Sequence, residues 1–480
     1  MEAERLFPAS ATIAPMSKRV FALLLLPAAG LTACDGLPVG TRGSRAPGST
    51  IEATARPTAV RLPADPKLSA PPPSATEADD FEPPSAVYAA RRARLLQRLG
   101  DGVAVVFGKK SIDDDERQDA DFYYLTGIVD PGAALVLAPA AKPHREMLYL
   151  KNRDPEVERW DGPRPPLSLE LKRRTGFERI RRTSRLPGAL SSLADKHRRL
   201  VFLGPIVGHD SPVPRALSVL RKVTARVPGA RIDNAADLLP RMRQIKGPQE
   251  IELIREATRA TGAGHAAALM ALKPGLSEWG LKDVIQRAFR DAGAKRLAFP
   301  SIVGSGPNSS VLHYRDDSRA MQEGEVVVID IGAEVEQYAS DITRTLPVGG
   351  RFSDRQREVY DLVLSAQEAA IAAIRPGIRV RDVDRTARDL IEAAGHHDDF
   401  IHGTSHFVGL SVHDAGRYGE PLLPGSVITV EPGVYLPHEG FGVRIEDVVL
   451  VTAEGHEVLS SGIPKAAEEI ERAMAGRTAP

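Results

Sequence analysis

The chain contains little cysteine, few aromatic residues and no excess of either charge. Cys34 is the only cysteine among 480 residues, which excludes an intramolecular disulfide. The 63 basic and 63 acidic side chains give a formal net charge of zero. A balanced chain of this kind gives no indication of a nucleic-acid partner or of electrostatic attachment to a membrane. Its length allows about two domains with additional tails.

No apolar run near the N-terminus is long enough to span a bilayer comfortably, yet residues 1–34 have the features of a signal segment. Lys18 and Arg19 precede the short apolar run Val20–Leu26, so Met16 is a better start for this pattern than Met1. Leu31-Thr-Ala-Cys34 follows and is similar to a bacterial lipobox, in which the cysteine is lipidated and becomes the new N-terminus. We therefore expect lipidation at Cys34. An ordinary signal peptide with a chance cysteine is the alternative.

The lipobox-like segment implies a place in the cell. We expect a protein of the bacterial cell envelope that is lipid-anchored and faces the periplasm, with the inner and the outer membrane both left open.

Residues 35–84 follow as a linker. The stretch Gly36–Pro84 has ten prolines and no aromatic residue before Phe81. Such a composition buries too little apolar surface to offset the entropy of ordering, so we expect a disordered tether.

Residues 85–240 are expected to form an α/β domain. A basic helix is predicted over residues 85–99, ending at Gly100. Buried strands are predicted for four apolar runs, at residues 103–107, 133–138, 147–150 and 200–203. A linker near residues 234–247 leads into a further helix that begins at Pro248, where proline in the first turn costs nothing. Ser353 and Gln356 predict a capping box at the start of another helix.

Four carboxylates in the C-terminal half lie on or beside apolar, strand-like runs. Asp330 ends one such run, and Glu431 ends a second one. Asp341 and Glu446 lie beside two more. Burying several ionised carboxylates together is costly unless a cation neutralises them. With His406 they make an oxygen-rich set that suits Mn²⁺ better than a metal that prefers thiolates. Taken singly, each acidic residue is more often a turn or cap residue.

An internal repeat organises these acidic residues. Ala271-Leu-Lys-Pro-Gly-Leu276 returns as Ala373-Ile-Arg-Pro-Gly-Ile378. The segment that ends at Asp330 has its counterpart in the segment that ends at Glu431, and Asp341 has its counterpart in Glu446. A duplicated unit that donates equivalent carboxylates from both copies indicates a pseudo-twofold site between them.

These segments resemble the pita-bread metallopeptidases, which include methionine aminopeptidase, aminopeptidase P, prolidase and creatinase. The motifs IVGSGPNSSVLHY, HGTSHFVGLSVHD, VEPGVY and GVRIEDVVLVT are most similar to those of aminopeptidase P. The resemblance implies that residues 246–474 form an α+β pita-bread catalytic domain. It also implies that the preceding domain is of the aminopeptidase P N-terminal type, and that the chain forms a homodimer or a dimer of dimers.

The resemblance implies a role for each site residue. Asp341 and Glu446 are expected to bridge two divalent cations, most plausibly Mn²⁺. Asp330 is expected to hold one ion, whereas His406 and Glu431 hold the other. Glu431 is the expected proton shuttle. The residues expected to bind the substrate, and with Glu431 to support catalysis, are His313, His402, His413 and Arg444.

The expected activity is removal of the N-terminal residue from peptides with proline in second place. An Xaa-Pro dipeptidase is one alternative, which the short segment between Val434 and Phe441 disfavours. A catalytically inactive peptide-binding protein is the other, which the presence of all five ligand types disfavours. Aspartates at positions 316 and 317 stand near the place where an asparagine is often found in this family, so recognition of the substrate's amino end remains open.

Overall fold

The structure is a computed structural model that describes residues 84–112 and 117–476. The predicted signal segment, the lipidation at Cys34 and the tether up to residue 83 lie outside these residues. Within the described ranges, no helix is both long enough and apolar enough to cross a membrane.

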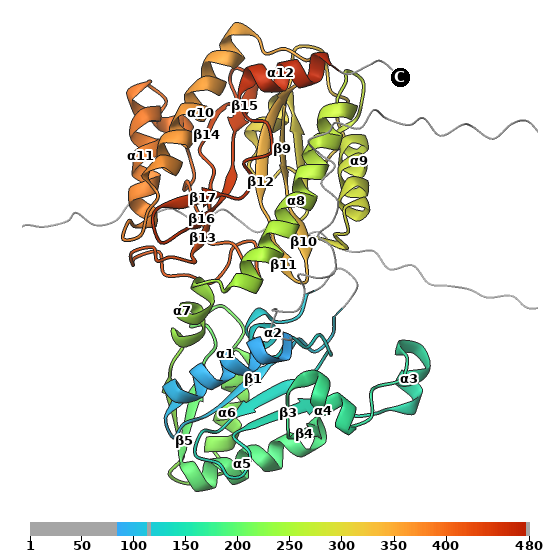
Figure 1. The fold of residues 1–480 in the computed structure, drawn as a ribbon, viewed down its shortest axis with the longest axis vertical. Coiled ribbons are helices and arrows are strands. Elements are labelled where there is room, and N and C mark those ends of the chain that lie inside the picture. The colour runs from blue at the N-terminus through green and yellow to red at the C-terminus, as the bar shows by residue number, and fades with distance from the viewer. Residues whose placement is uncertain (1–83, 113–116, 477–480) are drawn as a thin grey trace, which may run out of the picture. The chain divides into compact units, whose positions relative to one another are not determined.

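The N-terminal domain contains a six-stranded mixed sheet with the strand order β4-β3-β2-β1-β5-β6 (Figure 1). The strands are β1 Val103–Phe107, β2 Ala134–Leu137, β3 Glu146–Leu150, β4 Ile180–Arg182, β5 Arg199–Phe202 and β6 Arg231–Asn234. All four predicted apolar strands are confirmed. The prediction missed β4 and β6, which are short and carry polar residues.

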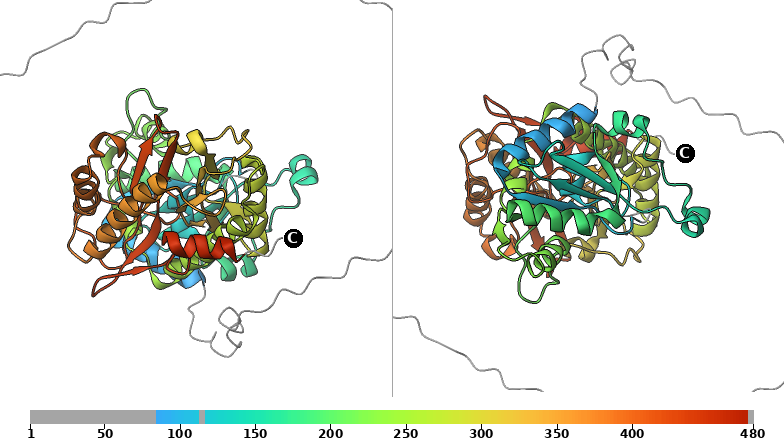
Figure 2. Two further views of the ribbon diagram at one scale, coloured as in Figure 1. Left: turned by 90° about the horizontal axis from the view of Figure 1, so that it is seen from above. Right: turned by 90° about the horizontal axis from the view of Figure 1, so that it is seen from below.

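Helices cover both faces of this sheet (Figure 2). They are α1 Pro84–Leu99, α2 Ala120–Thr126, α3 Pro155–Asp161, α4 Leu169–Thr175, α5 Leu186–His197, α6 Arg215–Thr224 and α7 Leu238–Gln244. Side chains alternate between the faces of a strand. Ala104 and Val106 of β1 therefore pack with Leu95 of α1, whereas Val103 and Val105 pack with α5 and α6. The basic helix is confirmed, and the expected linker at 234–247 contains α7.

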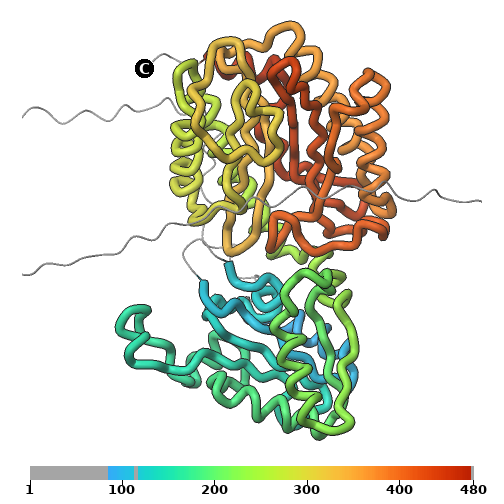
Figure 3. The backbone as a smooth tube through the Cα atoms, turned by 180° about the vertical axis from the view of Figure 1, so that it is seen from behind, coloured from blue at the N-terminus to red at the C-terminus, as the bar shows by residue number. Residues whose placement is uncertain are grey.

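The C-terminal domain consists of two similar halves (Figures 1 and 3), one coloured green to yellow and the other orange to red. The first half has helices α8 Pro248–Ala271 and α9 Glu278–Asp291, with strands β7 Arg296–Leu297, β8 Ile302–Ser305, β9 Val326–Ile331, β10 Ala333–Val335, β11 Tyr338–Ala339 and β12 Ile342–Pro347. The second has α10 Asp354–Ala373, α11 Val380–Ala393 and α12 Ala467–Ala475, with strands β13 Val427–Val430, β14 Gly433–Leu436, β15 Phe441–Arg444, β16 Asp447–Val451 and β17 His456–Val458. The predicted duplication is therefore present in the helices and strands.

Local sequence signals set the ends of the principal helices. Pro248 lies in the first turn of α8, as predicted. At α10 the Ser353 side chain accepts a hydrogen bond from the Gln356 N–H, and the Gln356 side chain accepts one from the Ser353 N–H. This reciprocal capping box satisfies two of the N–H groups that the first helical turn leaves free, and it confirms the prediction.

Polar contacts join the N-terminal domain to the C-terminal one. Arg117 Nε lies 2.8 Å from Glu334 Oε2, and the same guanidinium donates to the Leu410 and Ala298 carbonyl oxygens. Arg243 of α7 contacts the carboxylate of Asp414 in the C-terminal domain. These groups are largely buried, so each depends on its partner in the other domain.

Candidate metal centre and catalytic site

The duplicated strands bring the four predicted carboxylates to equivalent positions. In the first half β9 and β12 are antiparallel partners, Asp330 lies near the end of β9, and Asp341 immediately precedes β12. In the second half β13 and β16 are antiparallel partners, Glu431 follows β13, and Glu446 immediately precedes β16. Each hairpin-like pair therefore donates one carboxylate from the end of its first strand and one from just before its second.

The structure gathers all five expected ligands around one cavity of about 410 Å³. His406 Nε2 lies 3.3 Å from Asp341 Oδ2 and 3.4 Å from Glu431 Oε1. Donor atoms of Asp341, His406 and Glu446 all lie within 4.8 Å of one another. These side chains come from both halves of the domain, so the cluster exists only when the two halves are packed together.

The acidic side chains strongly disfavour one another's ionisation. Burial raises the pKa of Asp341 well above its usual value, and the nearby carboxylates of Asp330 and Glu431 raise it further. Glu446 shows the same effect, from burial first and then from Asp341 and Glu431. Burial raises the pKa of Glu431 to about 7, although His406 and Arg444 act in the opposite direction. Without a positive charge at its centre, this cluster would hold protons at neutral pH.

The donor set fits divalent cations. Asp330 Oδ1, Asp341 Oδ1 and Glu446 Oε1 are buried oxygen atoms with no hydrogen-bond partner among the described residues. Buried polar atoms are nearly always paired, and three unpaired carboxylate oxygens in one cluster are the pattern expected where cations complete the set. Carboxylate oxygens with a single imidazole suit hard to borderline divalent ions. The residues present therefore fit the metal pair that the sequence implied.

Arg444 holds the first carboxylate in place. Its Nη2 donates to Asp330 Oδ2 at 2.7 Å, its Nη1 donates to the Tyr435 hydroxyl at 3.0 Å, and its Nε donates to Thr343 Oγ1 at 3.2 Å. Thr343 in turn donates to Glu446 Oε2 at 2.8 Å. Because one buried guanidinium reaches both Asp330 and Thr343, Arg444 orients carboxylates from both halves of the domain.

The predicted histidines line the same cavity. His402 Nε2 lies 2.7 Å from the Tyr435 hydroxyl, and burial lowers the pKa of His402 to about 4. The rings of His406 and His413 are in edge-to-face contact, with centroids 4.3 Å apart. Burial lowers the pKa of His413, and the nearby His406 and His313 lower it further. His402 and His413 are therefore uncharged in the folded chain at neutral pH.

Two observations near His313 bear on the question that the sequence left open about Asp316 and Asp317. Asp317 does not face the cavity, since it is buried against the ammonium group of Lys282 and adopts a positive φ of 49°. Arg315 lies at the cavity instead and is exposed. The cavity lining on this segment thus includes the cation Arg315 and neither of the two aspartates.

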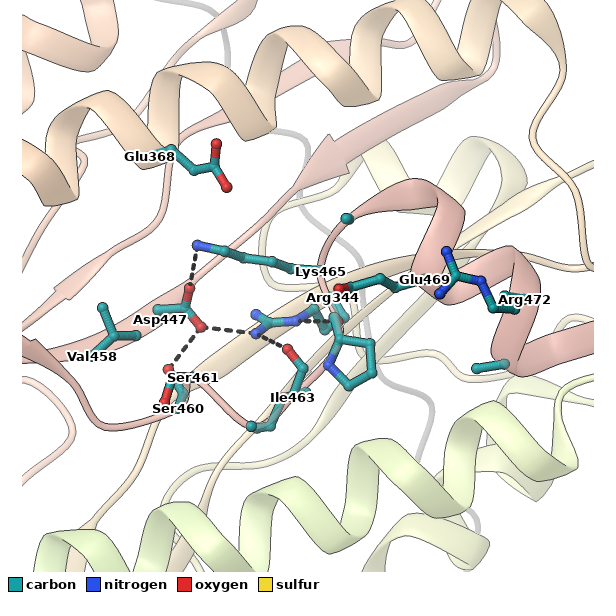
Figure 4. A pocket seen from close by; sticks show the side chains of 14 residues that line it. Arg344, Glu368, Asp447, Val458, Ser460, Ser461, Ile463, Lys465, Glu469 and Arg472 are labelled. Atoms are coloured by element: carbon teal, nitrogen blue, oxygen red, sulfur yellow. Dashed lines mark hydrogen bonds and ion pairs between the residues drawn. The ribbon is translucent and has the colours of Figure 1, made fainter. Parts of the chain in front are cut away.

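Sequence reasoning also missed a polar network around Arg344 and Asp447, which Figure 4 shows. Arg344 Nη1 donates to the Glu446 carbonyl oxygen at 2.6 Å, and its Nη2 donates to Asp447 Oδ1 at 2.8 Å. Ser460 and Lys465 also bind Asp447. Arg344 therefore fixes the main chain on which Glu446 is carried. Tyr435 was missed as well, although it stands within the quoted VEPGVY motif.

A second ionic cluster anchors the segment that carries His413. The carboxylate of Asp414 contacts both Arg243 and Lys246, and its Oδ2 lies 3.0 Å from Lys246 Nζ. The Asp414 N–H also donates to the Phe407 carbonyl at 2.7 Å. Because His406 precedes Phe407 and His413 precedes Asp414, this hydrogen bond keeps the two histidines close together.

Known proteins share both domains. Residues 252–453 match Metallopeptidase family M24, and residues 88–202 match the Aminopeptidase P, N-terminal domain family. The Xaa-Pro aminopeptidase of Escherichia coli is 34% identical over 430 residues, which cover 80% of this chain and 96% of that protein.

Solved structures agree with this relationship. A putative aminopeptidase P from Bacillus anthracis has a TM-score of 0.76 and 30% identity, covering 82% of this chain and 99% of that one. Zn-substituted E. coli aminopeptidase P in complex with product has a TM-score of 0.75 and 31% identity, covering 83% of this chain and 100% of that one. Because sequence and fold agree over both domains, the chain belongs to the aminopeptidase P family of M24 metallopeptidases.

Proposed function

We propose that this chain is an Xaa-Pro aminopeptidase, a metal-dependent hydrolase that releases the N-terminal residue from peptides with proline in second place. The observation that carries the proposal is the meeting of Asp330, Asp341, His406, Glu431 and Glu446 around one cavity, with three of their oxygens left unpaired. Two relatives that match over most of this chain, from Escherichia coli and Haemophilus influenzae, are Xaa-Pro aminopeptidases, which supports the same substrate class.

Two divalent cations, for which we propose Mn²⁺, would be held by these five residues and would supply an activated water together with positive charge for the developing oxyanion. Glu431 lies beside His406 at the cavity, so its carboxylate is placed to accept a proton from the activated water and to release it again. We assign it the transfer of that proton to the proline nitrogen, which leaves as a secondary amine.

The histidines have a separate role. His313 and His413 both line the cavity, and the nearby His313 contributes to lowering the pKa of His413. An imidazole N–H donated to the substrate carbonyl stabilises the tetrahedral intermediate and is worth about 3 kcal/mol per donor. His402 and Arg444 meet at the Tyr435 hydroxyl, so we assign them the positioning of the peptide and of Asp330.

The decisive experiment is hydrolysis of a peptide panel by the purified chain after chelation and after addition of Mn²⁺. We expect Xaa-Pro-Yaa peptides to be cleaved only with the cation, and Glu431→Gln to lower kcat by about 10²-fold or more because the proton carrier is lost. Glu454→Gln, at an exposed position outside the cavity, is the matched control. Activity that survives Glu431→Gln would contradict the assignment.

The two alternatives predict different results in the same panel. An Xaa-Pro dipeptidase would cleave Gly-Pro and leave longer Xaa-Pro-Yaa peptides intact. An inactive peptide-binding protein would contain no bound metal and would hydrolyse neither. The cavity residues favour the enzyme, because a binding protein has no need for three unpaired carboxylate oxygens at its centre.

We further propose a homo-oligomer, as a dimer or tetramer. Helix α3 contributes no buried side chain and leaves Trp160 88% exposed, so this tryptophan does not pack within its own chain. A large exposed aromatic side chain is typical of an interaction surface. Sedimentation of the wild type beside Trp160→Ser tests the proposal, and an unchanged mass would count against it.

We also propose that the chain is a lipid-anchored protein of the bacterial cell envelope that faces the periplasm. The support is the sequence Leu31-Thr-Ala-Cys34 behind a basic and apolar segment. Metabolic labelling with palmitate should mark the wild type and not Cys34→Ala. Equal labelling of both would exclude Cys34 as the site of attachment.

A further inference from the structure

In a second cavity, in the N-terminal domain, every charged side chain of the lining is basic. It has a volume of about 550 Å³ and lies between strands β3 and β4, at one edge of the sheet, and helix α5. Seven of its 16 lining residues are basic and none is acidic, although the whole chain has equal numbers of both charges. Those with a permanent charge are Lys142, Arg179, Arg181, Arg185 and Lys196.

The secondary structure concentrates these charges. Arg179 and Arg181 flank Ile180 at the edge strand β4, so their side chains share one face of the sheet. Tyr149 of β3 pairs with Arg181 and forms part of the same face. From α5, Lys196 lies seven residues after Ala189 and therefore on the same side of the helix.

Their charges have no acidic partner. Among the residues that the structure describes, none of the five permanent cations forms an ion pair with a carboxylate, whereas Arg199 on β5 of the same sheet pairs with Asp233. Glu178, next to Arg179 in the chain, lies 3.6 Å from His144 Nδ1 instead and is 88% exposed. A concave site lined by one sign of charge concentrates the field and attracts counter-ions of the opposite sign.

An ordinary solvated basic face does not account for this arrangement. Arg179 and Arg181 are only partly exposed, and Tyr149 beneath them is fully buried. Partial burial without a partner disfavours a charge, so a bound anion would stabilise the pair. The cavity also has the volume typical of small-ligand sites, which run from about 300 to 1,000 Å³.

We propose that this cavity binds a phosphate group, carried either by a small soluble anion or by a lipid headgroup. Guanidinium groups match phosphate oxygens with two parallel hydrogen bonds, and two neighbouring arginines on one strand face offer that geometry twice. The lysines add point charges at the rim. No residue of this cavity lines the candidate catalytic site, so the two sites are separate.

Calorimetric titration of the full chain tests the proposal with three probes: pyrophosphate, glycerol phosphate and dihexanoyl phosphatidylglycerol below its micelle concentration. The test variant is Arg179→Gln/Arg181→Gln. The matched control is Arg173→Gln/Arg174→Gln, which removes the same charge from exposed positions on α4. We expect binding to weaken about tenfold or more in the test variant, because charged hydrogen bonds are lost, and by less than about twofold in the control.

The probes separate the two sources of phosphate. Tighter binding of the lipid than of glycerol phosphate identifies a headgroup site, and tighter binding of pyrophosphate identifies a soluble ligand. Should the test variant fold poorly by circular dichroism, Arg185→Gln/Lys196→Gln at exposed positions provides the same comparison. Absence of binding for all three probes, or an equal loss in test and control variants, would overturn the proposal.

Discussion

Replacement of Asp414 by asparagine tests whether a buried ionic cluster holds the His413 segment in place. The side chains of Asp414 and Lys246 are each 1% exposed, and that of Arg243 is 9% exposed. Burial alone would raise the pKa of Asp414, but the charges of Lys246 and Arg243 lower it below its usual value. The substitution keeps the shape of the side chain and removes its charge.

Two buried cations would then lose their shared partner. Breaking a buried ion pair by removing one charge costs about 3–5 kcal/mol. Arg243 keeps Asp121 at 2.7 Å, so we expect the lower end, about 3 kcal/mol in the free energy of unfolding. Urea unfolding followed by fluorescence measures this change. Asp195→Asn is the control, because its pair with Arg198 is exposed and should contribute at most about 1 kcal/mol.

The same variant carries an acid-stability and an activity prediction. Because the folded pKa of Asp414 is lowered, its contribution is present above the ordinary carboxyl pKa near 3.9 and is lost as the pH falls through the lower folded value. The wild type and Asp414→Asn should therefore converge in stability in strong acid. A loss below about 1 kcal/mol at neutral pH would refute the ionic explanation.

Lower kcat for Xaa-Pro peptides is also expected for Asp414→Asn, because His413 adjoins the altered residue.

Three further perturbations have defined outcomes. Burial lowers the pKa of His265 to about 3, so the unfolded chain binds more protons than the folded chain below about pH 6.5. The free energy of unfolding of the wild type, relative to that of His265→Asn, should therefore fall by about 2 kcal/mol between pH 7 and pH 5. Urea titrations at both pH values measure this difference. A constant gap would exclude that titration. Arg315→Glu should shift the kcat/KM ratio of Xaa-Pro-Asp to Xaa-Pro-Lys peptides about tenfold toward the lysine peptide at low salt, and no shift would place Arg315 away from the bound peptide. Ser353→Ala removes the cap of α10 and should lower the free energy of unfolding by about 1 kcal/mol in thermal scans, whereas an unchanged midpoint would mean that packing alone fixes this end.

The duplication made the candidate site predictable. One segment occurs twice in the sequence, ending once at Asp330 and once at Glu431. Because both copies place a carboxylate at the same position after an apolar run, the sequence alone indicated the strands and the acidic residues. Confirmed strands such as β1 are continuous apolar runs, which is the pattern of strands buried on both faces.

Other features depend on distant contacts that no local pattern records. Arg344 looks like any strand arginine until the fold brings it to the Glu446 carbonyl. The sequence left the role of Asp317 open, and the fold places it in a buried ion pair with Lys282 on α9. The basic cavity of the N-terminal domain was also not visible in the sequence, since Arg179 and Arg181 lie at a strand of three residues.

The contacts of Arg117 and Arg243 limit how this protein can be shortened. Deleting the first domain through α7 would remove the guanidinium groups of Arg117 and Arg243 that contact Glu334 and Asp414, and would expose apolar residues of the shared core such as Tyr338 and Val408. A fragment that begins at residue 252, where the M24 match starts, would leave Glu334 and Asp414 without these cationic partners and would expose apolar side chains of the core to solvent. Shortened forms of this hydrolase should therefore begin near residue 84. Chimeric forms should take both domains from the same protein.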